Sequence, residues 1–390
     1  MTIGTLPFWT NPDAPRSGAI APERAPETPP PPPLLCSVII PVYNGAGFLA
    51  RALDALAAQQ LAPESFEIIL VDDGSTDDTW QVVRNWQSAH SAWHVRMVAQ
   101  QNRGQGAARN HGARLAQSPI LLFTDADCVP VRGWAVAFLE ALRGPSAPDA
   151  AMGTYTTKQD WRAPRFAQLE FEERYARMAR HGAIDLIATY SAAYKRDVFL
   201  AAGGFDENLV ENEDVEFSYR LSEAGRRMVF VPEAQVQHEH DLTWLDYANT
   251  KMGRGYWRTM VYRRHPGKAG KDSYTPQLLK LQVLLAPLAL LGFVAAICTR
   301  NPRRLGSALP FLLTTVPLVR FGVQRRSPAT FWAPFGSLVR ALAFGAGIAQ
   351  AFIALFTGKA LRGRRAQIAA AAAGTAGDQA QPRKESREAL

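Results

Sequence analysis

Between residues 36 and 127, short apolar runs rich in β-branched residues alternate with stretches of helical periodicity. This alternation restricts the fold more than any other feature of the chain, because strands that alternate with helices form a parallel sheet covered on both faces. We therefore predict an α/β fold with a mostly parallel sheet. The expected strands are 37–40, 66–71, 95–99 and 119–124, and the expected helices are 48–60, 76–86 and 106–116.

Polar side chains follow three of the four expected strands. They are Tyr43 and Asn44 after the first strand, Asp72 and Asp73 after the second, and Asp125 and Asp127 after the fourth. In parallel sheets, ligands bind beyond the carboxyl ends of the strands. We therefore expect a binding site at this edge of the sheet.

Asp125 and Asp127 are candidate ligands for a hard divalent cation. They lie one residue apart after a buried strand, and Mg²⁺ or Mn²⁺ prefers carboxylate oxygens while keeping positions for water and diphosphate. A solvated turn is the alternative interpretation. His238 and His240 lie two residues apart in an extended segment, so their rings point to one side and one of them is a candidate third ligand.

Two further features suit a bound nucleotide. The Asp73 carboxylate can accept the imide N–H of a uracil, and Tyr43 offers a face on which a base can stack. The Gly-rich loop 102–110 opens a helix whose N–H groups and dipole suit phosphate, with Arg109 as an added charge. For Asp73 and its neighbours in segment 71–77, an ordinary helix cap and turn is the alternative interpretation.

Residues 211–216 contain four carboxylates. Like charges beside an apolar wall raise the pKa of one carboxylate, which suits a general base. A solvated helix start, where the helix dipole favours acidic residues, is the alternative.

The C-terminal part, from about residue 278 onward, is far more apolar than the rest. Basic clusters border its three apolar runs, so we expect membrane helices and assign the net charge of +8 to a membrane surface, with no nucleic acid as partner. Buried core helices of a soluble domain are the alternative. The sequence leaves open whether three spans are present or two spans with an interfacial helix. The runs are 281–298, 305–323 and 341–357, and the clusters are 300–304, 325–326 and 359–365.

Taken in order, these segments resemble the inverting family-2 glycosyltransferases of the A-type fold. Each motif is weak alone, but the ordered set extends over residues 36–240, well over half of the chain. The matching segments are 41–44, 71–77, 102–110, 123–128, 213–214 and 236–238.

The resemblance implies roles for individual residues at the carboxyl edge of a nucleotide-sugar-binding sheet. Asp214 would be the catalytic base. The nucleotide sugar would be bound by Pro41, Tyr43, Asp73, Arg109 and Asp125, Mg²⁺ or Mn²⁺ by Asp127, Asp125 and His238, and the acceptor by Gly203, Gly204, Phe205, Asp206 and Glu213.

The resemblance also implies an activity, which is transfer of one hexose-like sugar from a nucleotide-diphospho-sugar, with a UDP-sugar favoured. The acceptor would be a hydroxyl of a lipid-linked glycan or polysaccharide precursor. Residues 254–258 read Arg-Gly-Tyr-Trp-Arg, unlike the Gln-x-x-Arg-Trp motif of processive members, which argues for transfer of a single sugar. A processive polysaccharide synthase is the alternative enzyme. A non-catalytic, membrane-anchored scaffold that binds sugar nucleotides is the alternative from another class.

The expected organisation places four segments along the chain. They are a disordered Pro-rich segment 1–34, a catalytic domain 35–272 with halves 35–130 and 131–272, membrane-associated helices 273–360, and a disordered basic tail 361–390. The three cysteines lack CxxC spacing, which argues against disulfides or zinc, and residues 1–34 lack a signal peptide. We therefore expect a bacterial inner-membrane protein with a cytoplasmic catalytic domain.

Overall fold

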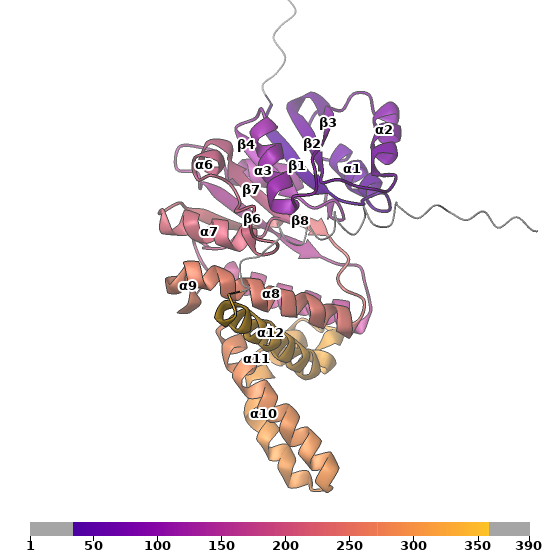
Figure 1. The fold of residues 1–390 in the computed structure, drawn as a ribbon. Helices are drawn as coiled ribbons and strands as arrows, with labels where there is room; N and C mark the ends of the chain where they lie inside the picture. Colours follow the sequence, from indigo (N-terminus) through magenta and orange to yellow (C-terminus); the bar gives the residue numbers. More distant parts are fainter. Residues whose placement is uncertain (1–33, 271, 359–390) are drawn as a thin grey trace, which may run out of the picture. The chain divides into compact units, whose positions relative to one another are not determined.

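The computed structural model describes residues 34–270 and 272–358. The predictions for segment 361–390 and for nearly all of 1–34 lie outside these residues. Within them, one mixed sheet of eight strands has the order β3-β2-β1-β4-β7-β6-β8-β5, with helices packed on it (Figure 1).

The first half of the sheet is parallel, as the alternation predicts. β1 pairs with β2 and β4, and β2 pairs with β3. All seven residues of β2, and every residue of β1 except Pro41, are buried, which explains their near-continuous apolar sequence. The bounds are β1 Cys36–Val42, β2 Phe66–Asp72, β3 Val95–Ala99 and β4 Ile120–Thr124, connected by α1 Leu49–Ala57, η1 Pro63–Ser65, α2 Thr79–Ala89 and α3 Gln105–Leu115.

The second half of the sheet reverses direction at β7, which runs antiparallel to both β4 and β6. β8 is parallel to β6 and antiparallel to β5. The predicted α/β fold is therefore confirmed, with the parallel order confined to β1–β4 and to the β6–β8 pair. The bounds are β5 Val129–Pro130, β6 Ala150–Thr156, β7 Ser191–Lys195 and β8 Met228–Gln237, with α4 Trp134–Ala141, α5 Arg162–Met178, α6 Arg196–Ala201 and α7 Glu213–Glu223.

Helices make up the rest of the described chain. Three stretches are long and apolar enough to cross a membrane, namely Gln277–Thr299, Pro302–Gln324 and Pro328–Phe356. The third is longer than the run 341–357 that the sequence suggested. The bounds are α8 Trp244–Arg264, α9 Pro266–Gly270, α10 Gln277–Thr299, η2 Pro302–Ala308, α11 Leu309–Gln324, η3 Pro328–Trp332 and α12 Ala333–Phe356.

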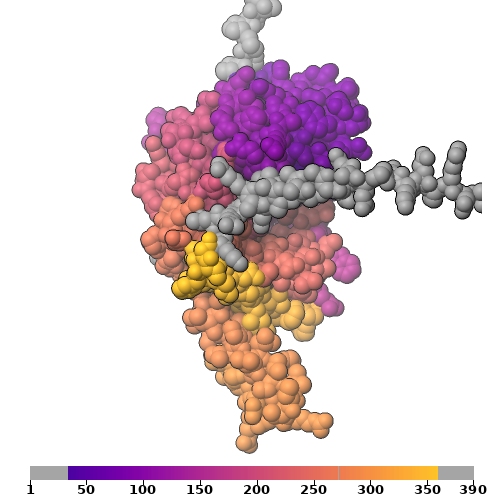
Figure 2. Space-filling view, in the orientation of Figure 1, coloured from indigo at the N-terminus to yellow at the C-terminus, as the bar shows by residue number. Residues whose placement is uncertain are grey.

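The helices α10, α11 and α12, here called the tail helices, expose their apolar side chains. Only 22%, 28% and 22% of the residues in the three apolar windows are buried. Leu284, Leu291 and Phe356 are 72%, 65% and 89% exposed. In Figure 2 the region where α10 ends and α11 begins projects away from the rest of the molecule, while the C-terminal part of α11 packs against α5. This exposure contradicts the alternative of soluble core helices and supports membrane association.

Helix α12 packs directly along α8, as Figure 1 shows. Two glycines allow this close approach. A Cβ on Gly255 would lie 2.3 Å from the carbonyl oxygen of Phe344, and a Cβ on Gly347 would lie 2.0 Å from that of Met252. The two backbones therefore touch at positions where any side chain would collide.

A buried charge cluster also connects α12 to the sheet domain (residues 34–270). The Arg340 guanidinium of α12 forms an ion pair with Glu170 of α5 and donates to Gln282 Oε1 of α10 at 2.6 Å. Lys251 of α8 reaches the same Glu170 carboxylate at 3.1 Å. An arginine inside an apolar helix thus finds its partners within the protein.

Candidate active site

Three cavities meet at the carboxyl ends of the parallel strands in the described part of the chain. We call them inner (about 270 Å³), middle (about 240 Å³) and outer (about 520 Å³). Asp125 lines the inner and middle cavities, and Asp127 lines the middle and outer ones. The two aspartates predicted from the strand end therefore stand where the three cavities join.

Asp127 and His238 lie together, with the Cys128 thiol beside them. The ligand atoms of these three residues lie within 4.8 Å of one another, and His238 Nδ1 is 3.7 Å from Asp127 Oδ2. Burial raises the pKa of the Cys128 thiol well above its usual value. The thiol therefore stays protonated and is a poor ligand. A carboxylate and an imidazole remain. The carboxylate suits Mn²⁺ or Mg²⁺, and the imidazole suits a transition metal, so the pair fits Mn²⁺ better than Mg²⁺.

Hydrogen bonds keep Asp127 ionised. Burial alone would raise the pKa of this carboxyl, but hydrogen bonding to His238 and to the Cys128 thiol brings it below its usual value. An ionised carboxylate is the form that binds a metal ion.

Arg109 joins the strand-end carboxylate to helix α7. Its side chain is 1% exposed, and its guanidinium donates to Asp125 Oδ1 at 2.5 Å and to Glu213 Oε1 at 2.7 Å. Both terminal nitrogens thus serve carboxylates of the protein, and a role of Arg109 in phosphate binding stays a prediction. The ion pairs fix the position of Asp125 relative to Asp214, the neighbour of Glu213.

Glu213 itself is buried beneath the inner cavity. Burial raises its pKa to about 7, although Arg109 opposes this shift. Its second oxygen, Oε2, has no hydrogen-bond partner among the described residues. Its predicted contact with the acceptor stays a prediction.

Asp214 faces the inner cavity from the first turn of α7. Its Oδ2 accepts from the Thr189 backbone N–H at 3.3 Å, and its Oδ1 accepts from the Val215 N–H at 2.8 Å. Burial raises the pKa of this carboxyl, and Arg109 lowers it in part. A raised pKa and a half-buried position in a cavity suit a general base.

The middle cavity contains the residues expected to contact the nucleotide. Asp73 accepts from the backbone N–H groups of Arg103 and Gly104 at 2.7 and 2.6 Å, so it holds the Gly-rich loop in front of α3. Gly104 has a φ of +86°, which explains the glycine there. Tyr43 is 52% exposed and lines this cavity beside Pro41.

Contacts within the protein hold the turn at residues 203–206 in place. Gly203 and Gly204 have φ values of +81° and +67°. The backbone of Phe205 exchanges two hydrogen bonds with the Asn110 side chain, and Asp206 pairs with Arg264. None of these four residues lines the inner, middle or outer cavity, so their predicted role in the acceptor site stays a prediction.

Comparison with known proteins identifies the domain to which these strand ends belong. Residues 37–201 match the family described as glycosyl transferase family 2. The chain contains a family-2 glycosyltransferase domain. The match includes β1–β4, the Gly-rich loop and both aspartates at the junction of the cavities.

Two curated relatives of this family-2 domain are glycosyltransferases. A validoxylamine A glucosyltransferase from Streptomyces hygroscopicus is 31% identical over 245 residues, covering 54% of this chain and 52% of that protein. A pre-mycofactocin glycosyltransferase from Mycobacterium tuberculosis is 27% identical over 285 residues, covering 70% and 57%. The chain therefore spans a little over half the length of these relatives.

A solved structure shares the fold. The mannosyltransferase PcManGT from Pyrobaculum calidifontis, in complex with GDP-Man and Mn²⁺, has a TM-score of 0.56 at 20% identity, covering 82% of this chain and 87% of that one. The likeness confirms the A-type glycosyltransferase fold that the sequence predicts.

Several residues of the candidate site escaped sequence reasoning. Thr189 and Tyr274 line the inner cavity from loops that carry no motif, whereas Tyr190, beside Thr189, begins the segment 190–206 that resembles an acceptor loop. Arg254 and Arg258 also line it, from one face of α8. The spacing of four between these arginines was the available signal, since residues four apart share a helix face.

Proposed function

We propose that this chain is an inverting, metal-dependent glycosyltransferase that moves one sugar from a nucleotide-diphospho-sugar to a hydroxyl. The observation that carries this proposal is the placement of Asp214. A carboxylate with a raised pKa faces the same cavity as Asp125. Asp127 lines the adjoining middle cavity, and its neighbour His238 lines the outer one.

The donor would lie across the middle cavity. Its base would stack on Tyr43 near Asp73, and its diphosphate would lie toward Asp127, with the sugar entering the inner cavity. Mg²⁺ or Mn²⁺ bound by Asp127 and His238, with Asp125 beside them, would offset the negative charge on the leaving diphosphate. A UDP-sugar is favoured because the Asp73 carboxylate can accept the imide N–H of uracil.

The residues of the chain then account for the chemistry. Asp214 accepts the proton of the acceptor hydroxyl as its oxygen bonds to the anomeric carbon. The bond from that carbon to the diphosphate breaks on the opposite side, so the anomeric configuration inverts. Arg109 keeps Asp125 and α7 at a fixed separation during this exchange.

The tail helices support an acceptor at a membrane. We propose a lipid-linked glycan or polysaccharide precursor as acceptor, and an inner-membrane location with the family-2 domain in the cytoplasm. The three apolar stretches with exposed side chains support association with a membrane.

A donor screen tests the proposal. Full-length protein in detergent is incubated with several nucleotide sugars, Mn²⁺ and a bacterial lipid extract, and transferred sugar and product length are measured. We expect one donor to give single-sugar transfer. Long polymers would instead favour a processive synthase, and the absence of transfer with every donor would argue for a scaffold.

The Asp214→Asn variant tests the mechanism within the same assay. It should lower kcat by roughly 10² or more with donor affinity unchanged, because the proton acceptor acts only in the transition state. Glu223→Gln is the matched control, since this carboxylate ends the same helix and lines none of the three cavities. Full turnover by the Asp214 variant would refute the assignment of the base.

A further inference from the structure

We propose that a cationic pocket between the sheet domain and the tail helices binds the phosphate group of a membrane-embedded acceptor. This inference rests on the proposed function, because it supplies that reaction with its second substrate. The pocket has a volume of about 50 Å³. Five cationic side chains and one carboxylate line it, namely Arg174, Lys251, Arg254, Arg258, Arg340 and Glu170.

The one carboxylate that lines this pocket is already paired with side chains of the protein. Glu170 receives Lys251 at 3.1 Å, and it also accepts from Arg340 and the Tyr247 hydroxyl. The charges of Glu170 and of Asp272, which lies 4.0 Å from Arg258, offset two of the five cations, so the pocket keeps an excess of positive charge. An anion is the ligand that such a pocket favours.

Arg174 gives the most direct indication that the pocket binds an anion. The residue is only 8% exposed, and its Nε has no hydrogen-bond partner in residues 34–270 and 272–358. Within the described residues its guanidinium forms no ion pair, and it rests on the rings of Tyr274 and Phe171 at 3.8 and 5.0 Å. Buried charges are strongly disfavoured without a partner, so an anion in the pocket would complete this environment.

Arg254 connects this pocket to the site of transfer. It is exposed, forms no ion pair among the described residues, and lines both the pocket and the inner cavity, as do Arg258 and Tyr274. An anion held at Arg174 and Arg254 therefore lies next to the cavity that Asp214 faces. The spacing suits an acceptor whose phosphate and hydroxyl are parts of one molecule.

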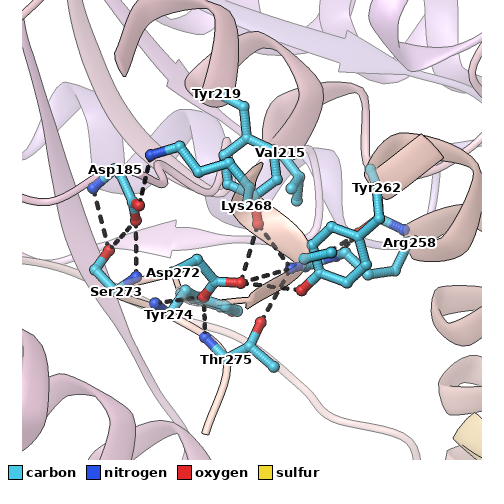
Figure 3. A network of polar contacts seen from close by, with 12 residues as sticks. Asp185, Val215, Tyr219, Arg258, Tyr262, Lys268, Asp272, Ser273, Tyr274 and Thr275 are labelled. Atoms are coloured by element: carbon cyan, nitrogen blue, oxygen red, sulfur yellow. Dashed lines mark hydrogen bonds and ion pairs between the residues drawn. The ribbon is translucent and has the colours of Figure 1, made fainter. Parts of the chain in front are cut away.

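The wall of the pocket is fixed by a polar network, which Figure 3 shows from close by. Asp272 accepts from the hydroxyls of Tyr219 and Tyr262, both at 3.0 Å, and lies 4.0 Å from Arg258. It also accepts from the Tyr274 N–H at 2.9 Å, which holds the ring of Tyr274 over Arg174. The positive groups are thus held in place before any ligand binds.

The remaining wall of the pocket indicates that the phosphate belongs to a lipid. Leu279, in the first turn of α10, and Phe344 of α12 line it from the side of the tail helices. Both helices continue as candidate membrane spans. A phosphate ester with an apolar chain satisfies both walls, whereas free phosphate satisfies only the cationic one.

Three probes separate these sources of phosphate. Dodecyl phosphate, dodecanol and inorganic phosphate are each titrated into full-length protein in uncharged detergent, and binding is measured by thermophoresis. We expect dodecyl phosphate to bind at least roughly tenfold more tightly than either other probe, because charge-assisted hydrogen bonds and apolar contact act together. Equal binding of dodecanol, or of inorganic phosphate, would overturn the lipid phosphate assignment.

Variants locate the site. Arg254→Gln and Arg174→Gln should each weaken dodecyl phosphate binding about tenfold or more. The exposed Arg254 keeps the test valid if the buried Arg174 variant does not fold. Arg263→Gln is the matched control, since Arg263 is exposed at the end of the same α8 and lines neither cavity. An equal loss in the control, or no loss in Arg254→Gln, refutes the proposal.

The proposed function and the phosphate-binding pocket can be tested independently of each other. Asp214→Asn should abolish most transfer but leave dodecyl phosphate binding intact, since Asp214 does not line the pocket. Arginine-dependent binding without transfer by the unchanged protein would contradict the enzyme assignment and leave the pocket standing. Transfer without arginine-dependent binding would contradict the pocket and leave the enzyme assignment standing.

Discussion

Glu170 offers a quantitative test of how the tail helices are fastened to the sheet domain. The buried carboxylate accepts from Lys251 and Tyr247 of α8 and from Arg340 of α12. Burial alone would raise the pKa of Glu170, but the charges of Lys251 and Arg340 hold it well below its usual range. The charge of this one carboxylate therefore stabilises two buried cations.

The perturbation is Glu170→Gln, which keeps the shape and removes the charge. Breaking a buried ion pair costs about 3–5 kcal/mol. Lys251 can relieve part of this cost, because burial already lowers its pKa to about 7 and it can lose its proton. Arg340 stays charged but keeps Gln282 as acceptor. We therefore expect the lower end, a loss of about 3 kcal/mol in the free energy of unfolding.

The assay is thermal unfolding of full-length protein in detergent, followed by tryptophan fluorescence. A loss of 3 kcal/mol lowers the Tm by roughly 6–12 °C for a domain of this size. Glu173→Gln is the control one turn away on α5, where the partly exposed pair with Arg177 is worth about 0.5 kcal/mol. If both variants lower the Tm equally, the cluster does not fasten the tail helices and the reasoning is wrong.

Three further predictions concern the metal, the pH dependence and the α8–α12 contact. Asp127→Asn should weaken Mn²⁺ binding at least roughly tenfold and abolish transfer. The control Asp78→Asn, at an exposed position, should do neither. If Asp127→Asn binds Mn²⁺ as tightly as the unchanged protein, Asp127 is not a ligand. Burial lowers the pKa of His240 to about 3, so below pH 6.5 the unfolded chain binds a proton that the folded chain does not. Relative to His240→Gln, the free energy of unfolding of the unchanged protein should then fall by up to about 1.4 kcal/mol per pH unit as the pH drops from 6.5 to 4.5; parallel curves for the two proteins would contradict this. Gly347→Ala should destabilise the protein by about 1–3 kcal/mol through collision with the Met252 carbonyl, whereas Gly182→Ala, with open space around it, should have little effect; equal unfolding midpoints would disprove the close contact.

The parallel half of the sheet was predictable because each strand there carries its own local signal. The β-branched runs of β1 and β2 are buried on both faces, and short helices separate them, so local periodicity and pairing order agree. The reversal at β7 was not predictable, because the short sequence of this strand does not encode the direction of its neighbours. That choice depends on packing between segments far apart in the chain.

The candidate site also contains residues that the sequence predicts and residues that it does not. Asp125, Asp127 and Asp73 follow strands directly, so their common edge follows from topology alone. The pairing of Arg109 with Glu213 joins positions 104 residues apart, and no local pattern reveals it. The isolation of Arg174 is less visible still, since a charged helix normally implies solvent, and only the packing of α5 against its neighbours shows that this guanidinium is buried.

The close approach of α8 and α12 at Gly255 and Gly347 bears on how this protein could be engineered. A tail that served only as an anchor could be exchanged for an unrelated membrane segment. Here a foreign segment would need a small residue opposite each backbone crossing and a cation aimed at Glu170. Chimeras joined before α10 should therefore fold poorly unless the face of α12 is transplanted with them, and a soluble version would need α8 redesigned first.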